Sequence, residues 1–395
     1  MAKQKWWINR DALLISLSAF FADMGYQAIL AGFPVFLVLI LHAPAYYLGL
    51  AYALAYGIGA LFGTLGGILG DRYGRKKIAI FGNVFILILP MLSFAANALQ
   101  ALIIYSTGWW ARNFRTPARR AMLSESTTAG ERPHAFGLLH ALDIGGGAIA
   151  VAYLAILLYL KFSLQSVFIL TAIPITFSTV CLIFVRNRRK SKRASEKKIN
   201  HAMPSNKEKM RSDVLKGILV STALFGFSSY SLGFPILTIA SRAGNDIIGI
   251  LSYLVYLAFS ATAGYIVGVQ ARRLNMVKGL AFLGYLLSAI GSLTLAVYYA
   301  FSLNFMVSYA AVALLGIALG AIETFEPTII TLITKKSEQG KNLGYLTSFR
   351  SIGLFVANIG MGLLYVLNPS YSYIYATIVA LMAVVVLMYF GRNFA

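Results

Sequence analysis

Long apolar stretches separated by short polar ones run along the whole chain. Each stretch has roughly 20 residues or more, enough for an α-helix to cross the hydrocarbon core of a bilayer. The alternation of apolar and polar residues that marks a barrel strand is absent, so helices must satisfy the backbone in lipid. The pattern predicts an all-α polytopic membrane protein with twelve transmembrane helices. They are expected at residues 11–40, 46–69, 78–97, 99–122, 135–160, 164–186, 214–240, 246–271, 278–300, 304–331, 342–366 and 371–391.

The placement of the charged residues gives this topology an orientation. Only 12% of the 395 residues are charged, against about 25% in soluble proteins, yet the net charge is +21. Basic residues fall in every second loop and at both termini, whereas the opposite side receives only Lys161 and Arg242. The positive-inside rule therefore predicts cytoplasmic N- and C-termini. The surplus charge is assigned to orientation and anionic-lipid contact, which argues against nucleic-acid binding.

The chain divides into two halves around one strongly basic segment. We expect an N-terminal six-helix bundle at residues 1–186, a basic cytoplasmic linker at 187–212 and a C-terminal six-helix bundle at 213–395. The linker is either a solvated loop or a helix on the bilayer surface. Whether it is ordered is left open.

Weak internal similarities indicate that the two halves are repeats. Gly32-Phe33-Pro34 recurs as Gly233-Phe234-Pro235, and Pro117 precedes Gly130 by the same interval that separates Pro327 from Gly340. With that shift His140 falls on Arg350. Parallel repeats of this kind predict a central cavity between the halves and alternating access by rocking.

The sequence lacks the residues that several classes of function require. No G-x-x-x-x-G-K-[ST] loop is present to bind nucleotide phosphates. The four histidines and one cysteine have no metal-ligand spacing. We expect no enzyme activity, no cofactor and no bound metal.

One loop between the second and third predicted helices concentrates charge between glycines. It reads GILGDRYGRKK and contains Gly67, Gly70, Asp71, Arg72 and Gly74, followed by Arg75 and two lysines. This segment resembles the signature loop of the major facilitator superfamily of secondary transporters, and the resemblance extends over the twelve-helix topology. The position of Arg112 in helix 4 is similar to that of the helix-4 arginine in the proton-coupled multidrug antiporters of that superfamily.

The same loop predicts a gate on the cytoplasmic side. The glycines permit close helix approach and a tight turn. The resemblance implies that Asp71 binds the N-terminal end of helix 11 in the other half, and Arg75 is placed to reach Glu125 at the end of helix 4. These contacts would latch the halves together while the cavity faces outward. The alternative is a loop whose charge only sets topology.

Four ionisable residues at membrane depth are the main candidates for proton coupling and substrate binding. They are Asp23 on helix 1, Arg112 on helix 4, and Glu323 and Glu326, one turn apart on helix 10. A proton or a cationic substrate would compete for Asp23, with Arg112 as its neighbouring cation. The alternatives are a structural ion pair between helices 1 and 4, and a Glu326 that only caps the cavity mouth.

A second group of residues is open to two interpretations. Arg115 lies one turn from Arg112, where the antiporter pattern has no arginine, and His140 and Asp143 share one face of helix 5. His140 and Asp143 are each either a secondary site residue or a packing residue, and Arg115 is either a secondary site residue or part of an interfacial stripe of arginines. Trp109 and Trp110 flank Arg112 and either stack on substrate or pack between helices.

The sequence thus predicts a secondary transporter in the plasma membrane, the inner membrane of a bacterial cell. The leading hypothesis is proton-coupled efflux of amphipathic or cationic compounds by a monomer. One alternative is a proton-coupled symporter for an organic anion or another metabolite, held by the arginines. An alternative from another class is a non-transporting membrane receptor or scaffold. The expected partners are a small-molecule substrate, protons and the lipid bilayer.

Overall fold

Helices form all the regular structure that the computed structural model describes, which covers residues 9–128, 132–186, 205–270, 275–334 and 339–391. The first half contains α1 (Arg10–Val35), η1 (Phe36–Ile40), α2 (Tyr46–Tyr52), η2 (Ala53–Ile58), α3 (Gly59–Tyr73), α4 (Arg75–Ile86), η3 (Leu89–Phe94), α5 (Ala98–Ser126), α6 (Arg132–Tyr159), α7 (Leu164–Leu170) and α8 (Ala172–Phe184). The second half contains α9 (Ser205–Ser228), α10 (Gly233–Ala243), α11 (Asp246–Gln270), α12 (Met276–Gly279), η4 (Leu280–Leu286), α13 (Leu287–Phe301), α14 (Phe305–Ile333), α15 (Gln339–Leu367) and α16 (Pro369–Gly391).

These elements join end to end into membrane-spanning units. Within the described ranges, eleven helical units are long and apolar enough to cross a bilayer. The remaining predicted span is α5, whose 29 residues are long enough but include Arg112, Arg115, Arg119 and Arg120. These arginines lower its hydropathy, although α5 packs against α3 and α4 like its neighbours. The twelve-helix fold is confirmed.

The seventh span differs from its predicted range of 214–240. Its helix begins at Ser205, inside the range expected to be linker, while residues 187–204 lie outside the described part of the chain. The span is also interrupted at residues 229–232 and resumes as α10. Pro235 lies in the first turn of α10, where its missing amide donor breaks no helical hydrogen bond.

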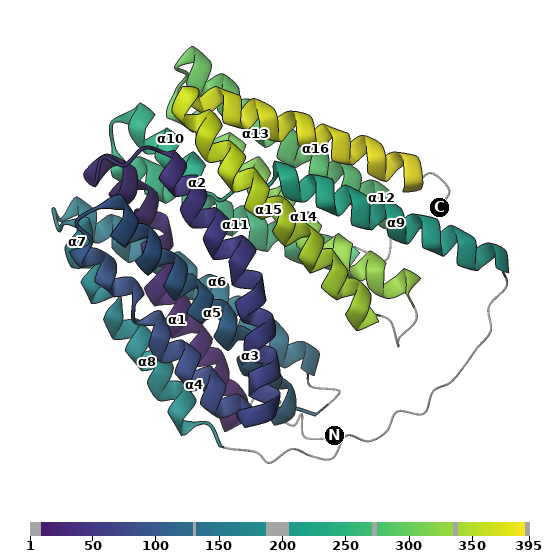
Figure 1. Ribbon diagram of the computed structural model, residues 1–395, viewed down its shortest axis with the longest axis horizontal. Helices are drawn as coiled ribbons and strands as arrows, with labels where there is room; N and C mark the ends of the chain where they lie inside the picture. Colours follow the sequence, from purple (N-terminus) through teal and green to yellow (C-terminus); the bar gives the residue numbers. More distant parts are fainter. Residues whose placement is uncertain (1–8, 129–131, 187–204, 271–274, 335–338, 392–395) are drawn as a thin grey trace, which may run out of the picture.

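Each half packs mainly within itself. In the first half α1 contacts α6 and α8, and α5 contacts α3 and α4. In the second half α11 contacts α14, and α9 contacts α15 and α16. Contacts between halves join α2 to α15, α6 to α11 and α1 to α10. Figure 1 shows the halves meeting near α2 and α10 and diverging toward the lower ends of α3 and α15.

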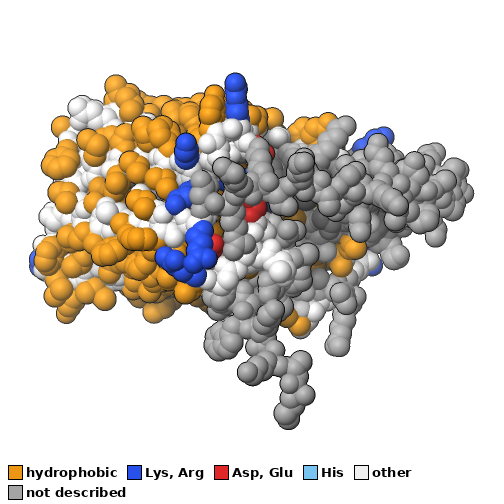
Figure 2. All heavy atoms as spheres, turned by 90° about the horizontal axis from the view of Figure 1, so that it is seen from below, with side chains coloured by type: hydrophobic (Ala, Val, Ile, Leu, Met, Phe, Trp, Pro, Cys, Tyr) orange, Lys and Arg blue, Asp and Glu red, His pale blue; other side chains and the backbone are white. Residues whose placement is uncertain are grey.

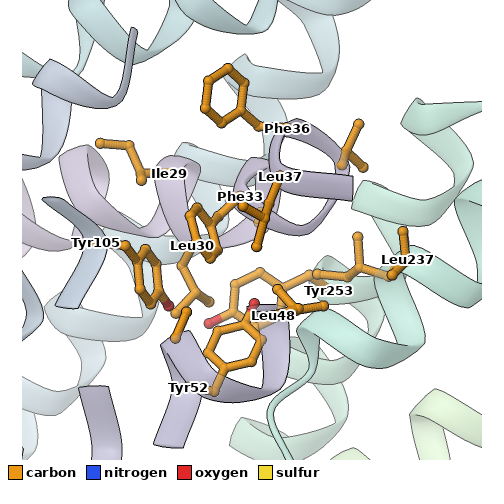
Figure 3. Packing of buried hydrophobic residues seen from close by; sticks show 14 of the residues in the cluster. Ile29, Leu30, Phe33, Phe36, Leu37, Leu48, Tyr52, Tyr105, Leu237 and Tyr253 are labelled. Atoms are coloured by element: carbon orange, nitrogen blue, oxygen red, sulfur yellow. The ribbon is translucent and has the colours of Figure 1, made fainter. Parts of the chain in front are cut away.

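The two ends of the molecule differ in how closely the halves approach. At the end where α2 begins and α10 finishes, here called the far end, glycines allow the two halves to approach closely. A Cβ added at Gly49 of α2 would lie 2.3 Å from the carbonyl oxygen of Asn358 on α15. A Cβ at Gly233 of α10 would lie 1.9 Å from the Tyr52 hydroxyl. Figure 3 shows the adjoining core, where Leu48 and Tyr52 lie beside residues of α10 and α11.

The opposite end carries the charged loop between α3 and α4. In Figure 2, which shows the molecule from below, Lys, Arg and acidic side chains gather near the middle while hydrophobic side chains cover the flank. Large apolar side chains are exposed along the outer helices, including Leu61, Phe81, Phe177 and Val385. A hydrophobic flank of this kind is compatible with a lipid surrounding and not with water. The chain is therefore a multi-pass membrane protein.

Candidate functional site

A cavity of about 590 Å³ lies between the two halves. Its wall is mainly aromatic and aliphatic, and serine hydroxyls from the break between α9 and α10 face it. Among the described residues that line it, three are charged: Arg112, Glu323 and Arg350. The other lining residues used below are Gln27, Tyr56, Trp109, Tyr253 and Tyr256. The cavity thus has the apolar lining and few polar groups of a small-molecule site.

Asp23 lies beside this cavity, in the interior of α1, and is only 3% exposed. Its Oδ1 accepts a hydrogen bond from the Tyr26 hydroxyl and a second, of 3.1 Å, from Gln27 Nε2. Its Oδ2 has no hydrogen-bond partner among the described residues. A buried carboxylate with an open acceptor is able to take up a proton without breaking an existing bond.

Arg112 is a neighbouring cation of Asp23, as predicted, but Tyr26 lies between the two side chains and they do not form a direct ion pair. Arg112 Nε donates to the Tyr26 hydroxyl over 3.2 Å, while that hydroxyl donates to Asp23. The guanidinium also lies over the rings of Tyr26 and Trp109, at 5.3 and 4.9 Å from their centroids. Side-chain rings thus hold Arg112 at the cavity wall through cation–π contacts.

The two tryptophans beside Arg112 have different surroundings. Trp109 is buried and lines the cavity, in contact with Arg112. Trp110 stacks on Phe62 at 4.9 Å, and its Nε1 donates to the Leu54 carbonyl oxygen over 2.8 Å. Trp110 is therefore a packing residue between α5 and the second span.

Glu323 and Glu326 both bind the guanidinium of Arg350 on α15. Glu326 is fully buried, and its Oε1 also accepts hydrogen bonds from Tyr285 at 2.7 Å and Thr222 at 3.1 Å. The side chain of Glu323 is 57% exposed and faces the cavity. Glu326 therefore does not cap the cavity mouth, and the two carboxylates are not equivalent.

Arg115 lies in the interior of the first half and has no exposed surface. It donates to Asn83 Oδ1 on α4, and the Asn83 amide donates to Thr179 on α8 over 2.7 Å. Two of its nitrogens, Nε and Nη2, have no partner among the described residues. Arg115 is outside the cavity lining, so the structure places it in helix packing.

Asp143 and His140 lie on α6, nearer the charged loop. Asp143 pairs with Arg119 across 3.4 Å, and its side chain is 24% exposed. His140 is exposed one turn away on the same helix. Neither residue lines the cavity, so the structure does not bring them together with Glu323 or Arg350.

The charged loop forms an ion-pair cluster on its own half. Arg75 Nη1 lies 2.7 Å from Glu125 on α5, as predicted, and Arg75 Nη2 lies 2.8 Å from Asp71. Gly74 has φ +106°, which favours glycine, and this residue ends α3 and starts α4. Arg72 contacts the ring of Tyr73 at 5.3 Å. The expected contact of Asp71 with helix 11 concerns the start of α15, where the side chains of residues 339–341 lie outside the described part of the structure.

The other two loop glycines make looser contacts. The Cβ positions of Gly67 and Gly70 lie 3.6 and 3.4 Å from Pro117 and Ala118 on α5. Only ordinary van der Waals contacts would follow from a methyl group there. The tight approach instead involves Gly66, whose Cβ would lie 1.9 Å from the carbonyl oxygen of Phe114.

Sequence reasoning missed four site residues that the tertiary structure brings together: Tyr26, Gln27, Tyr253 and Arg350. Arg350 carried a usable signal, because an arginine at membrane depth is costly and generally has a function. The other three are uncharged and common in apolar helices. Nothing in the local pattern distinguishes them from packing residues.

The chain matches known proteins at the level of family. The profile described as "Major Facilitator Superfamily" matches residues 15–276 and 217–394. A curated relative, "Uncharacterized MFS-type transporter YqjV" of Bacillus subtilis (strain 168), is 25% identical over 275 residues. That alignment covers 67% of this chain and 64% of the relative, so the match spans somewhat less than two thirds of the relative's length.

Solved structures are similar over nearly the whole chain but at low identity. The crystal structure of a D-xylose-proton symporter has a TM-score of 0.74, with 13% identity over 97% of this chain and 98% of that one. A mutant of the nucleoside transporter NupG has a TM-score of 0.77, with 12% identity and coverage of 98% and 100%. A POT family transporter in complex with 5-aminolevulinic acid has a TM-score of 0.77, with 12% identity and coverage of 99% and 98%. These similarities show the fold.

Proposed function

The chain belongs to the major facilitator superfamily, and on that premise we propose that it is a secondary transporter exporting amphipathic cations in exchange for protons. The halves would rock about the cavity so that it opens to one side of the membrane at a time. We expect a monomer in the plasma membrane. Transport of small molecules is the general part of the proposal, and cation–proton exchange is the specific part.

The observation that carries the specific part is the position of Glu323. Its carboxylate faces a cavity lined by aromatic rings. Glu323 is the one acidic residue among the described residues that line this cavity. Aromatic faces attract organic cations, and a carboxylate among them adds a full opposite charge. An amphipathic cation would place its apolar body on Tyr56, Trp109 and Tyr256 and its charge near Glu323.

The charged groups in and behind the cavity wall support a cation. The three charged residues of the described lining, Arg112, Arg350 and Glu323, sum to +1, and the buried Asp23 and Glu326 behind them add two negative charges, so one negative charge is left over when all five are ionised. Arg350 has two carboxylate partners and keeps Glu326 if Glu323 is withdrawn. A substrate cation or a proton would therefore satisfy Glu323 without leaving a buried charge unpaired.

The proton and the substrate would use overlapping groups, which is what exchange requires. Glu323 is exposed to the cavity and accepts either a cation or a proton. Asp23 is buried behind Tyr26 and outside the lining, so a proton reaches it in this state whereas a bulky cation does not. We assign substrate and proton binding to Glu323 and proton binding to Asp23.

Ligand binding by the purified protein tests this proposal. Tetraphenylphosphonium should raise the melting temperature in detergent, more at about pH 8 than at about pH 5.5, because protons compete for the carboxylate. Glu323→Gln should abolish the effect. Asp246→Asn, at the start of α11 and away from the cavity lining, is the matched control and should bind as the wild type does. Stabilisation that survives Glu323→Gln would contradict the assignment.

An organic-anion symporter is the second candidate because Arg112 also faces the cavity. Guanidinium groups bind carboxylates in a planar, two-point geometry. Under this alternative benzoate would stabilise the protein, and Arg112→Gln would lose the effect while Glu323→Gln kept it. A receptor or scaffold that does not transport would exchange neither labelled organic cations nor labelled organic anions in proteoliposomes.

A further inference from the structure

The side chain of Gln27 joins Asp23 to the other half of the molecule. Gln27 Nε2 donates to Asp23 Oδ1 over 3.1 Å, and Gln27 Oε1 accepts from the Tyr253 hydroxyl over 2.7 Å. Tyr253 is on α11, so this chain of hydrogen bonds runs from a buried acid of the first half to a helix of the second. An amide has one donor side and one acceptor side, and both are used here.

This connection lies where the two halves close on each other. Tyr253 is 6% exposed and belongs to the same buried cluster as Tyr52, Tyr105 and Leu237. Figure 3 shows these residues together at the meeting of the two halves. Gln27 and Tyr253 also line the cavity, so their hydrogen bond crosses from one half to the other at the cavity wall. Opening of the far end would have to separate them.

The strength of the connection depends on the charge of Asp23. A hydrogen bond to an ionised acceptor is roughly twice as strong as one between neutral groups. Ionised Asp23 therefore fixes the amino side of Gln27, which leaves the carbonyl side directed at Tyr253. A proton on the open Oδ2 removes that charge and weakens the hold on the amide.

We propose that Gln27 is a positioning residue that locks the far end closed while Asp23 is ionised and the cavity is empty. A proton on Asp23 releases the lock by weakening the bond to Gln27. A substrate releases it by occupying the cavity and competing for Gln27 and Tyr253. This inference rests on the proposed exchange function, for which an empty, unprotonated carrier must not reorient.

Other charged groups face the same acid and set the pH at which the lock responds. On α1 itself Tyr26 donates to Asp23, and on α5 Arg112 binds that hydroxyl. Arg119 on α5 and Asp143 on α6 interact with Asp23 electrostatically, and Arg115 is on the same segment of α5. The last group is the Tyr253 hydroxyl on α11. Substitutions at the charged positions would shift the pH of release, whereas loss of Gln27 would abolish it.

Distance measurements across the far end test the lock without substrate. Spin labels would be placed at Leu160→Cys and Phe301→Cys, exposed residues at the ends of α6 and α13, in a Cys181→Ser background in lipid nanodiscs. The wild type should show the short distance at about pH 8 and gain a longer one at about pH 5. Gln27→Leu and Tyr253→Phe should each raise the ratio of the long-distance population to the short-distance population about tenfold at about pH 8.

Matched variants separate a lock from general destabilisation. Tyr265→Phe removes an exposed hydroxyl from the same helix, outside the cavity lining, and should behave as the wild type does. The double variant Gln27→Leu/Tyr253→Phe should equal either single variant, because both act through one hydrogen bond. Asp23→Asn should give the long distance at both pH values.

A Tyr253→Phe variant that keeps the wild-type distances and their pH response would overturn the proposal, as would independent effects in the double variant. Transport gives a separate readout: Gln27→Leu proteoliposomes should dissipate a pH gradient several-fold faster than the wild type without substrate. If the wild type exchanges no cations but the distances respond as described, the proposed function fails and the lock stands.

Discussion

Glu326 and Arg350 form an ion pair in the interior of the second half. The carboxylate has no exposed surface, and the guanidinium side chain is 20% exposed. Burial of both groups costs solvation energy, which their mutual contact, the hydrogen bonds from Tyr285 and Thr222, and the contact of Arg350 with Glu323 offset. Glu323 shares the same arginine from a position open to the cavity, and this contrast yields a direct test.

Glu326→Ala should destabilise the protein by about 3–5 kcal/mol, because it removes the buried partner of Arg350. Glu323→Ala should cost at most about 1 kcal/mol, since its side chain is largely solvated in the cavity. Thermal unfolding in detergent without ligand measures both. Glu323 is the matched control, on the same helix and with the same partner. Equal losses for the two variants would contradict the division of roles.

Asn83→Ala should destabilise the protein by about 3 kcal/mol, because the buried guanidinium of Arg115 then loses its partner. Arg115→Met should be neutral or stabilising, since a methionine of similar length removes the buried charge altogether. Unfolding in increasing detergent or denaturant distinguishes the two. The double variant Asn83→Ala/Arg115→Met should be more stable than Asn83→Ala alone, and the opposite order would refute the packing role of Arg115.

Asp71→Asn should change the conformational population more than the stability. Its pair with Arg75 is partly exposed and is worth at most about 1 kcal/mol, so the melting temperature should hardly change. If Asp71 also binds the second half, as the family resemblance implies, its loss should increase the population in which the charged end is open. Spin labels at Lys77→Cys and Ser348→Cys would report a longer distance. An unchanged distance distribution would leave the loop with only a topological role.

Gly49→Ala should hinder closure of the far end, because the added methyl group would lie 2.3 Å from the Asn358 carbonyl oxygen. Gly360→Ala is the matched control on α15: nothing lies within 4 Å of its Cβ position, so it should be neutral or slightly stabilising. The spin-label pair at the far end would measure the effect. If Gly49→Ala leaves the short distance intact, the glycine contact does not control closure.

The candidate site was only partly visible in the sequence. Arg112 and Glu323 were selected because charges at membrane depth are costly, and both line the cavity. The same argument selected Arg115 and Asp143, which pack away from the cavity. Cost of burial indicates that a charge has a partner. It does not indicate whether the partner is a substrate or another helix.

The sequence by itself determined the helical membrane fold, the spans and the charged loop. Lipid enforces these features locally, because each apolar stretch must satisfy its own backbone. The Arg75–Glu125 contact was also predictable, since the motif fixes which loop meets which helix end.

Only the tertiary structure decided which side chains converge. The interposition of Tyr26 between Asp23 and Arg112, the sharing of Arg350 by two glutamates, and the reach of Gln27 to Tyr253 depend on how each helix is rotated about its axis. In a soluble protein an apolar stripe reveals that rotation. Here lipid and bundle interior are both apolar, so the local pattern leaves the rotation undetermined and packing between helices decides it.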